Sequence, residues 1–514
     1  MKLQYSYRLQ PGQTNFLKAG QKIFVRFNLG ANQQDTEYGE VVSVQSDHLI
    51  FRRDATAGTS LYPPNAIFEN EWIPLADKPK VVGDWVKQAT ERWGSPTAEA
   101  PTGHPTLDLL MRRKPRLIGG KPLPSADPSN YLPAVIQAIE LLDHSTLAVQ
   151  GPPGSGKTYL ASHAIAHLVR QGKSVGVTAN SHSAVNNLLQ ACLAAGVEPT
   201  SIAKRNGTGD NTLRPWATPR DNAALATWRQ AVSAEGHLIG GTSWGFTSKG
   251  SLEQTFDYIF IDEAAQFSLV DAIAVGHNAK NIILLGDPQQ LTQVVQALHP
   301  GGVDNSALGH YMGEQEILDP EHGYFVEVTR RMHPEVNEPV SWLAYQGRLR
   351  SHPEASGQSI AGVAPGFTAV PVEHFGNSSH SQEEVEVVVA MVKKHLSQVS
   401  PDEILVVAPY NAQVDSIRDA LDAAGLNKVE VGTVDKFQGR EAMIVIISLA
   451  ASTAEDAPRG LDFLLDRNRL NVALSRAKTN SYLVYSPSLV RTRFTNIEDL
   501  KSVSRLAGLL EFAN

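Results

Sequence analysis

The sequence reads Leu147-Ala148-Val149-Gln150-Gly151-Pro152-Pro153-Gly154-Ser155-Gly156-Lys157-Thr158 where a short apolar run passes into a glycine-rich turn. A helical pattern follows over residues 159–170. A strand, such a turn and a helix form a P-loop, in which backbone N–H groups point at phosphate oxygens beside the positive end of the helix. We expect residues 151–158 to bind a nucleoside triphosphate, with Lys157 at the β- and γ-phosphates and the Thr158 hydroxyl on Mg²⁺. A purely structural turn is the alternative, and the flanking strand and helix disfavour it.

The same succession of apolar run, turn and helical stretch is repeated along the chain. Further apolar runs lie at residues 174–178, 258–261, 282–285, 404–407 and 443–448. Continuous apolar runs of this length are typical of parallel strands that are buried on both faces. We therefore predict an α/β fold with enough strands for two parallel sheets.

Two acidic residues, Asp262 and Glu263, end the apolar run at 258–261. We expect Asp262 to hold Mg²⁺ through water, and Glu263 to orient and deprotonate the water that attacks a phosphate. Alone, such a pair is a weak signal, because a helix N-cap followed by a first-turn acid looks the same. The catalytic interpretation of this pair is strengthened by its position about a hundred residues after the P-loop. A kinase or a GTPase would satisfy both motifs.

The chain before residue 129 follows a different pattern. Short strands with alternating apolar residues at 22–27, 39–44 and 48–52 predict a small β-barrel over residues 1–75, either structural or nucleic-acid-binding. Residues 76–128 are expected to form a helical stalk with helices at 84–92 and 106–113, separated by a loop rich in Pro, Gly and Thr at 94–105. A basic run in this stalk contacts phosphates or forms a solvated face, and both interpretations stay open. It comprises Arg112, Arg113, Lys114 and Arg116.

The bulk composition sets only wide limits. A chain of 514 residues predicts about two to four domains. The formal net charge of −8 argues against a protein that coats nucleic acid over its whole surface, but not against a locally basic groove. The lone Cys192 excludes an intrachain disulfide or a cysteine zinc cluster. The sequence has no signal-peptide core and no run of about 20 apolar residues, so we expect a cytoplasmic protein without a membrane partner.

Six segments after the P-loop separate the remaining classes, because in this order the chain resembles superfamily 1 helicases. They read Asp262-Glu263-Ala264-Ala265-Gln266, Gly286-Asp287-Pro288-Gln289-Gln290-Leu291, Arg330-Arg331-Met332-His333-Pro334, Ala408-Pro409-Tyr410-Asn411-Ala412-Gln413, Val431-Gly432-Thr433-Val434-Asp435-Lys436-Phe437-Gln438-Gly439-Arg440-Glu441 and Arg469-Leu470-Asn471-Val472-Ala473-Leu474-Ser475-Arg476-Ala477-Lys478. The resemblance implies two RecA-like domains, at residues 129–322 and 323–514.

Within the superfamily, the third, fifth and sixth segments resemble the branch that contains the nonsense-mediated-decay helicase, which moves 5′→3′. The chain also resembles the helicase half of bacterial proteins that carry an N-terminal RecB-like nuclease. This resemblance covers most of the chain from about residue 106 onward. We find no nuclease half in the sequence, so the chain is expected to act alone, to recruit a separate nuclease, or to be a fragment.

The resemblance also implies which residues form the ATP site. Lys157, Glu263 and Gln290 would lie on the first domain, and Arg331 and Arg476 would reach the γ-phosphate from the second as arginine fingers. Residues near the base, ribose and γ-phosphate would be Arg330, Gly439 and Glu441, with Arg330 stacked on adenine where relatives often carry an aromatic residue. Gln137 is an open candidate for reading adenine, because its spacing from the P-loop departs from the family pattern.

Contacts to nucleic acid are likewise implied by the resemblance. They would come from Ser181, His182, Thr242 and Trp244 in the first domain and from Thr433 in the second, with Trp244 stacking on a base. Each has a structural alternative as a turn or core residue. Contacts of this kind reach the backbone, so we expect weak sequence preference.

Taken together, these patterns predict an ATP-dependent helicase or translocase with Mg²⁺, acting 5′→3′ on single-stranded DNA. DNA is favoured over RNA only through the resemblance to nuclease fusions. An RNA helicase, or an ATP-gated clamp that does not move processively, is the alternative. A P-loop kinase or GTPase switch would show activity indifferent to nucleic acid.

Overall fold

A computed structural model describes residues 2–8, 17, 19–28, 34–44, 48–54, 66–69, 77–93, 103–207, 210, 212–248, 255–293, 302–491 and 497–513. The chain divides into two compact units, Met1–Leu75 and Ala76–Asn514, and each is treated by itself. Most of the loop predicted at 94–105 lies outside the described residues. In the part of the chain that is described, no helix combines the length and the apolar character that crossing a membrane requires.

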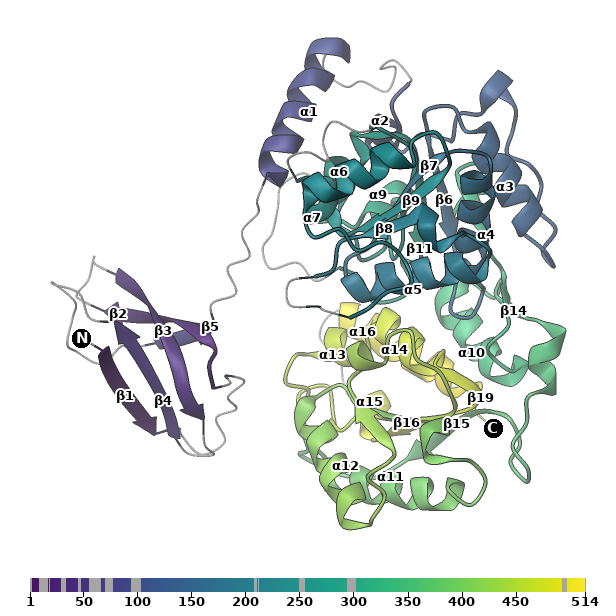
Figure 1. The fold of residues 1–514 in the computed structure, drawn as a ribbon. Helices are drawn as coiled ribbons and strands as arrows, with labels where there is room; N and C mark the ends of the chain where they lie inside the picture. The colour runs from purple at the N-terminus through teal and green to yellow at the C-terminus, as the bar shows by residue number, and fades with distance from the viewer. Residues whose placement is uncertain are drawn as a thin grey trace. The chain divides into compact units, whose positions relative to one another are not determined.

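The first unit is an antiparallel sheet of five strands in the order β1-β4-β3-β2-β5 (Figure 1). The strands are β1 (Lys2–Arg8), β2 (Lys22–Asn28), β3 (Gln34–Val44), β4 (His48–Asp54) and β5 (Ala66–Glu69). Alternation along β4 buries every second side chain against a core of Ile23, Val25, Val41, Leu49 and Phe51. The predicted strands are therefore present. No pairing of β1 with β5 closes them into a barrel within the described residues.

The predicted stalk helices are α1 (Lys78–Trp93) and α2 (Pro105–Leu110). Both pack on the first lobe of the second unit, because Trp85 of α1 and Leu107 and Leu109 of α2 join its apolar core. Asp108, buried in α2, lies 3.2 Å from the Arg116 guanidinium and 3.9 Å from that of Arg113. These two arginines of the basic run thus hold the stalk segment in place.

The first lobe contains a seven-stranded parallel sheet in the order β12-β6-β11-β10-β7-β9-β8. Its strands are β6 (Thr146–Gln150), β7 (Ser174–Thr178), β8 (Ile202–Lys204), β9 (His237–Gly241), β10 (Phe256–Ile261), β11 (Ala279–Gly286) and β12 (Gly323–Phe325). Helices cover both faces, in two separate apolar clusters. They are α3 (Leu132–Leu141), α4 (Lys157–Arg170) and α5 (His182–Ala194) on one face, and α1, α2, α6 (Asn222–Ala231), α7 (Ser243–Phe246), α8 (Leu269–Gly276) and α9 (Ala307–Met312) on the other.

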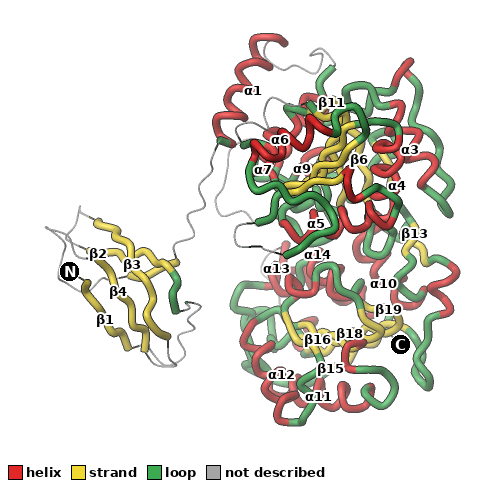
Figure 2. The backbone as a smooth tube through the Cα atoms, in the orientation of Figure 1, coloured by secondary structure: helices red, strands yellow, loops and turns green. Residues whose placement is uncertain are grey.

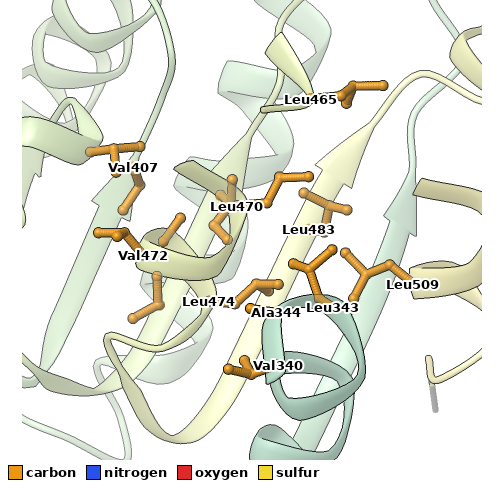
Figure 3. Packing of buried hydrophobic residues seen from close by; sticks show 14 of the residues in the cluster. Val340, Leu343, Ala344, Val407, Leu465, Leu470, Val472, Leu474, Leu483 and Leu509 are labelled. Atoms are coloured by element: carbon orange, nitrogen blue, oxygen red, sulfur yellow. The ribbon is translucent and has the colours of Figure 1, made fainter. Parts of the chain in front are cut away.

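The second lobe repeats this plan with a five-stranded parallel sheet in the order β15-β19-β18-β16-β17. The strands are β15 (Gly366–Pro371), β16 (Ile404–Val407), β17 (Glu430–Gly432), β18 (Ala442–Ser448) and β19 (Ala477–Tyr485). The helices are α10 (Pro334–Tyr345), α11 (Gln382–His395), α12 (Asn411–Ala423), α13 (Leu461–Leu464), α14 (Arg467–Leu474), α15 (Ser488–Arg491) and α16 (Ile497–Leu510). Figure 3 shows Leu343 of α10, Leu470 of α14 and Leu509 of α16 gathered beside Leu483 of β19. The predicted α/β fold with two parallel sheets is confirmed.

The crossing between the lobes starts later than the sequence indicated. Strand β12, which the predicted boundary at residue 323 assigned to the second lobe, pairs in parallel with β6 of the first sheet. Its Tyr324 and Phe325 are buried, so apolar pairing outweighs the motif position that suggested the boundary. The chain then crosses through β13 (Val328–Thr329), which pairs with β14 (Arg350–Ser351) of the second lobe (Figure 2).

Candidate nucleotide site and nucleic-acid surface

The P-loop lies between β6 and α4, at the carboxyl edge of the first sheet. Gly154 and Gly156 have φ angles of 73° and 86°, in the left-handed region that glycine adopts without strain. A Cβ atom at Gly151 would collide with the side chain of Lys157, whose ammonium donates a hydrogen bond to the Gly151 carbonyl. The loop is therefore shaped by glycine at the positions where its backbone must turn toward a ligand.

The carboxylates Asp262 and Glu263 follow β10, next to the P-loop strand's neighbour β11. The Asp262 N–H donates to the carbonyl of Thr178, and the Glu263 N–H donates to the Asp262 carboxylate at 3.0 Å. Burial, and then the negative charge of Glu263, raise the pKa of Asp262 to about 7, while Lys157 opposes this. The positive charge of Lys157 therefore does not balance the two carboxylates.

This donor set fits a Mg²⁺–nucleotide complex. The buried hydroxyls of Ser155 and Thr178 have no hydrogen-bond partner, and the raised pKa of Asp262 would fall beside a cation. Thr158, in the first turn of α4, is exposed. Among the described residues, no group of three or more His, Cys, Asp or Glu side chains could hold a metal ion. In nucleotide sites Mg²⁺ is usually held by one or two carboxylates together with water and substrate phosphates.

Gln290 lies in the turn after β11 and connects the first lobe to the second. Its amide donates to the buried carboxylate of Asp287 at 2.9 Å, and Gln150 donates to the other oxygen of that carboxylate at 3.3 Å. The Gln290 oxygen faces Nη2 of Arg476, across the boundary between the lobes, at 3.5 Å.

Arg476 is fully buried at the end of α14. Its Nε donates to the Val472 carbonyl at 3.0 Å and its Nη1 to the Arg440 carbonyl at 3.3 Å. Burial, and then the nearby Arg331, lower the pKa of Arg476 to about 9, whereas Glu263 of the first lobe favours its charge. A buried cation held by neutral oxygens is suited to an incoming anion.

Arg331 lies where the crossing segment contacts the P-loop. A Cβ at Gly154 would lie 2.5 Å from Cβ of Arg331, and the Arg330 N–H donates to the Gly154 carbonyl at 2.9 Å. The Arg331 guanidinium donates to Glu441 at 2.7 Å and to the Ser475 carbonyl at 3.1 Å. Burial would raise the pKa of Glu441. Its two cationic partners, Arg331 and Lys478, nevertheless hold the pKa of Glu441 below its ordinary value.

The three remaining nucleotide-site candidates lie at the edge of this cluster. Gly439 has a φ angle of 80° and open space where a Cβ would stand. The half-exposed guanidinium of Arg330 pairs with Glu354 at 3.3 Å, so its predicted stacking on adenine requires it to leave that pair. Gln137 is exposed on α3.

The sequence did not reveal a buried network that joins the lobes. The Tyr345 hydroxyl, at the end of α10, donates to Asp287 at 2.7 Å and accepts a hydrogen bond from Asn471 at 2.9 Å. The same amide of Asn471 donates to the Gln289 carbonyl at 2.6 Å. Arg467 adds a salt bridge to Glu316 of the first lobe. Asn471 lies in a recognised segment, but no motif signals Tyr345.

The four first-lobe candidates for nucleic-acid contact line one surface hollow of about 360 Å³. They are Ser181, His182, Thr242 and Trp244. Ser181 also caps α5 by accepting from the Ala184 N–H at 3.2 Å. The Lys78 ammonium lies 4.0 Å from the Trp244 ring centroid and 2.8 Å from Asp271. No sequence motif predicts these two contacts. Thr433 lies at the end of β17 in the second lobe and is not among the lining residues.

A phosphate loop, two strand-end carboxylates and guanidinium groups from a second lobe define a two-lobed P-loop nucleoside-triphosphate-binding protein. Family comparisons agree with this class. Two family models, both described as an AAA domain, match residues 134–317 and 303–488, one for each lobe.

Curated relatives narrow the class. The chain is 26% identical to the DNA replication ATP-dependent helicase/nuclease DNA2 of Gallus gallus, over 68% of this chain and 36% of the relative. It is 28% identical to the DNA-binding protein SMUBP-2 of Rattus norvegicus, over 66% and 41%, and 27% identical to the regulator of nonsense transcripts 1 of Dictyostelium discoideum, over 64% and 29%. Each lobe therefore matches an AAA-domain model, and the chain is similar in sequence to these helicases and nucleic-acid-binding relatives.

The chain spans less than half the length of each of these relatives. Among solved structures, the arterivirus nonstructural protein 10 helicase matches with a TM-score of 0.41 and 16% identity, over 95% of this chain and 77% of that chain.

Proposed function

We propose that this chain is an ATP-driven motor that moves 5′→3′ along single-stranded DNA and unwinds duplexes. One observation carries the proposal: groups suited to ATP hydrolysis converge from two lobes of one chain. Lys157, Asp262 and Glu263 lie on the first lobe, while Arg331 and Arg476 come from the second and contact the P-loop segment and Gln290.

In this proposal the phosphates lie on residues 151–158, with Lys157 at the β- and γ-phosphates and Thr158 and Asp262 at Mg²⁺. When bound, Mg²⁺ neutralises charge on the phosphate oxygens. Glu263 orients the attacking water and accepts its proton. Arg331, pre-positioned by Glu441, and the buried Arg476 stabilise charge that develops on the γ-phosphate.

Movement follows from the same contacts. With the γ-phosphate present, both arginines hold the second lobe against the first, and its loss releases them. A nucleic-acid strand lying over the hollow near Trp244 and over Thr433 would be gripped by the two lobes in turn. Contacts to the backbone would give little sequence preference.

DNA is proposed because two of the relatives carry DNA in their names, one as a replication helicase/nuclease. The likeness to a helicase/nuclease also motivates a nuclease as a partner protein. A relative named for nonsense transcripts supports RNA as the second candidate. Action in the cytoplasm remains a prediction from the sequence.

The test is ATP turnover titrated with single-stranded DNA and with RNA, followed by displacement from duplexes with 5′ or 3′ tails. We expect stimulation by DNA and displacement only from 5′-tailed DNA. Preference for RNA in both assays would establish the second candidate. Stimulation without displacement would identify an ATP-gated clamp. Turnover indifferent to both polymers would refute the motor and favour a kinase or GTPase-like switch.

A further inference from the structure

A second cavity, of about 230 Å³, adjoins the hollow that holds the four candidate contacts. It is enclosed by α6, the end of β9, α7 and the segment 205–207. His182, Thr242 and Trp244 line both the cavity and the hollow. The two spaces therefore meet at residues that are already candidates for touching a nucleic-acid strand.

The walls of the cavity are suited to a flat aromatic ring. Trp244, Phe246 and Phe256 contribute aromatic surface, and the last two meet edge to face with centroids 5.5 Å apart. Glycines 240, 241 and 245 add no side chains, and a Cβ at Gly245 would meet open space. An engineered apolar cavity of about 150 Å³ binds benzene, so this cavity has room for one aromatic heterocycle.

Two polar residues of the lining, Arg205 and Asn206, each have a side-chain atom that lacks a hydrogen-bond partner. Nε of Arg205 and Oδ1 of Asn206 are buried without a hydrogen-bond partner, one a donor and the other an acceptor. A buried group left unpaired costs free energy, and a ligand edge that reached it would recover that cost. The described lining includes Arg205 and Arg229 but no carboxylate, so it suits a neutral ring near a phosphate chain.

We propose that this cavity, here called the base pocket, receives one unstacked nucleobase of the strand that lies in the adjoining hollow. A nucleobase combines a flat ring with donors and acceptors at its edge, and unstacked bases are commonly held on aromatic side chains. Continuity through Thr242 and Trp244 favours a base from a bound strand over a free nucleoside. The inference rests on the proposed function and adds a site at which the strand is held by a base.

Ala226 of α6 lines the base pocket, so Ala226→Trp fills it. Ala223→Trp is the matched control, because Ala223 is exposed on the same helix and does not line the pocket. Each protein is titrated, with a non-hydrolysable ATP analogue, against a thymidine oligonucleotide and against a fully abasic oligonucleotide of the same length. The comparison does not depend on the register of binding.

We expect Ala226→Trp to weaken binding of the thymidine oligonucleotide by about tenfold and to leave the abasic one unchanged, since one stacked base contributes on this scale. Ala223→Trp should change neither. Equal affinity of Ala226→Trp and wild type for the thymidine oligonucleotide, or equal weakening for both oligonucleotides, would overturn the base pocket while leaving the motor intact. Failure of the wild type to bind either oligonucleotide would instead refute the proposed function.

Photocrosslinking identifies the source of the base. An oligonucleotide of 4-thiothymidine should crosslink to Phe246 or Phe256, which line the base pocket but not the hollow, and Ala226→Trp should abolish these crosslinks. If free 4-thiothymidine crosslinks to these residues and the oligonucleotide does not, the pocket binds a nucleoside and the proposal is wrong.

Discussion

Glu263 has a φ angle of 51°, a left-handed conformation that residues other than glycine rarely adopt. Such a conformation costs on the order of 1–3 kcal/mol and persists where surrounding contacts impose it. Here the next residue, Ala264, donates its N–H to the Leu285 carbonyl of the adjacent strand, which fixes the turn. The strain is located at the carboxylate proposed to activate water.

Glu263→Gln tests that role. The amide keeps the size of the side chain but cannot accept the proton, so ATP turnover should fall by about 10²- to 10⁴-fold. Binding of a fluorescent ATP analogue should be retained. Glu335→Gln, on the outer face of α10's first turn, serves as the control and should leave turnover intact. Normal turnover in Glu263→Gln would show that another group is the base.

We expect Asp262 to make the binding of Mg²⁺–nucleotide depend on pH. Its raised pKa means that the folded chain binds this proton more tightly than the unfolded chain does, so protonation stabilises the fold. That stabilisation is complete below the ordinary pKa of 3.8 and is lost as the pH rises through about 7.

Because Mg²⁺ requires the carboxylate, binding of Mg²⁺–nucleotide should release a proton just below pH 7, and affinity should fall as the pH is lowered further. Calorimetric titrations in buffers of different ionisation enthalpy measure this release. Asp262→Asn should abolish it. Proton release that is identical in wild type and Asp262→Asn would contradict the assignment.

At the scale of single residues, the sequence predicted those candidates that are positioned by their neighbours in the chain. The P-loop glycines and the carboxylates after β10 are tied to their neighbours in the chain, so the motif and the geometry coincide. The contact of Lys78 with Trp244 and the bond of Tyr345 to Asp287 join distant segments and leave no local pattern. Such pairings depend on packing between elements, which a single sequence does not display.

Among the elements, α10 is one that contacts the first lobe at its end. It begins directly after the crossing segment, with Pro334 in its first turn, and ends at Tyr345, whose side chain is fully buried. The helix therefore connects the P-loop contact at its start to the Asp287 network at its end.

Tyr345→Phe removes the hydroxyl that joins Asp287 to Asn471. Both partners would stay buried with one hydrogen bond fewer, so the free energy of unfolding should fall by about 1–2 kcal/mol. Denaturant titration measures the change. Tyr485→Phe is the comparison, since that ring is only partly buried and its hydroxyl has no hydrogen bond among the described residues. Equal effects of the two substitutions would argue against a special role of the network.

The stalk shows how an element can be predicted while its role is not. The helices at 84–92 and 106–113 were expected and are present as α1 and α2. Their burial against the first lobe was not expected, because the apolar residues that mediate it, such as Trp85, are sparse in a polar segment. Asp108 then binds two arginines whose sequence suggested contact with phosphate.

For the whole molecule, hydrolysis should require both lobes at once. Arg476→Ala removes the buried cation at the boundary, and turnover stimulated by nucleic acid should fall by about 10³- to 10⁵-fold, as for other arginine fingers. Steady-state turnover measures this, and thermal unfolding checks the fold. Arg491→Ala, at an exposed arginine of the second lobe, is the control. Full activity of Arg476→Ala would place hydrolysis within the first lobe alone.

The two-sheet architecture was predictable because each buried parallel strand is a continuous apolar run in the sequence, and such runs recur through both lobes. The N-terminal unit was harder to predict. Alternating apolar and polar residues predict its strands, but closure into a barrel depends on pairing between the two edge strands, which this alternation does not encode. The boundary at residue 323 failed for a similar reason, since the three residues of β12 are too few to signal which sheet they join.

The two hydrogen bonds from the crossing segment to the P-loop, Arg330 N–H to Gly154 and Thr329 hydroxyl to Pro153, act like a latch. A force on the second lobe acts directly on the P-loop, because these two bonds join the crossing segment to P-loop residues. Drawing the lobes apart beyond the reach of these bonds must either break them or reshape the cradle. A force that separates the lobes at these two bonds would therefore weaken the proposed grip of the P-loop on a nucleotide.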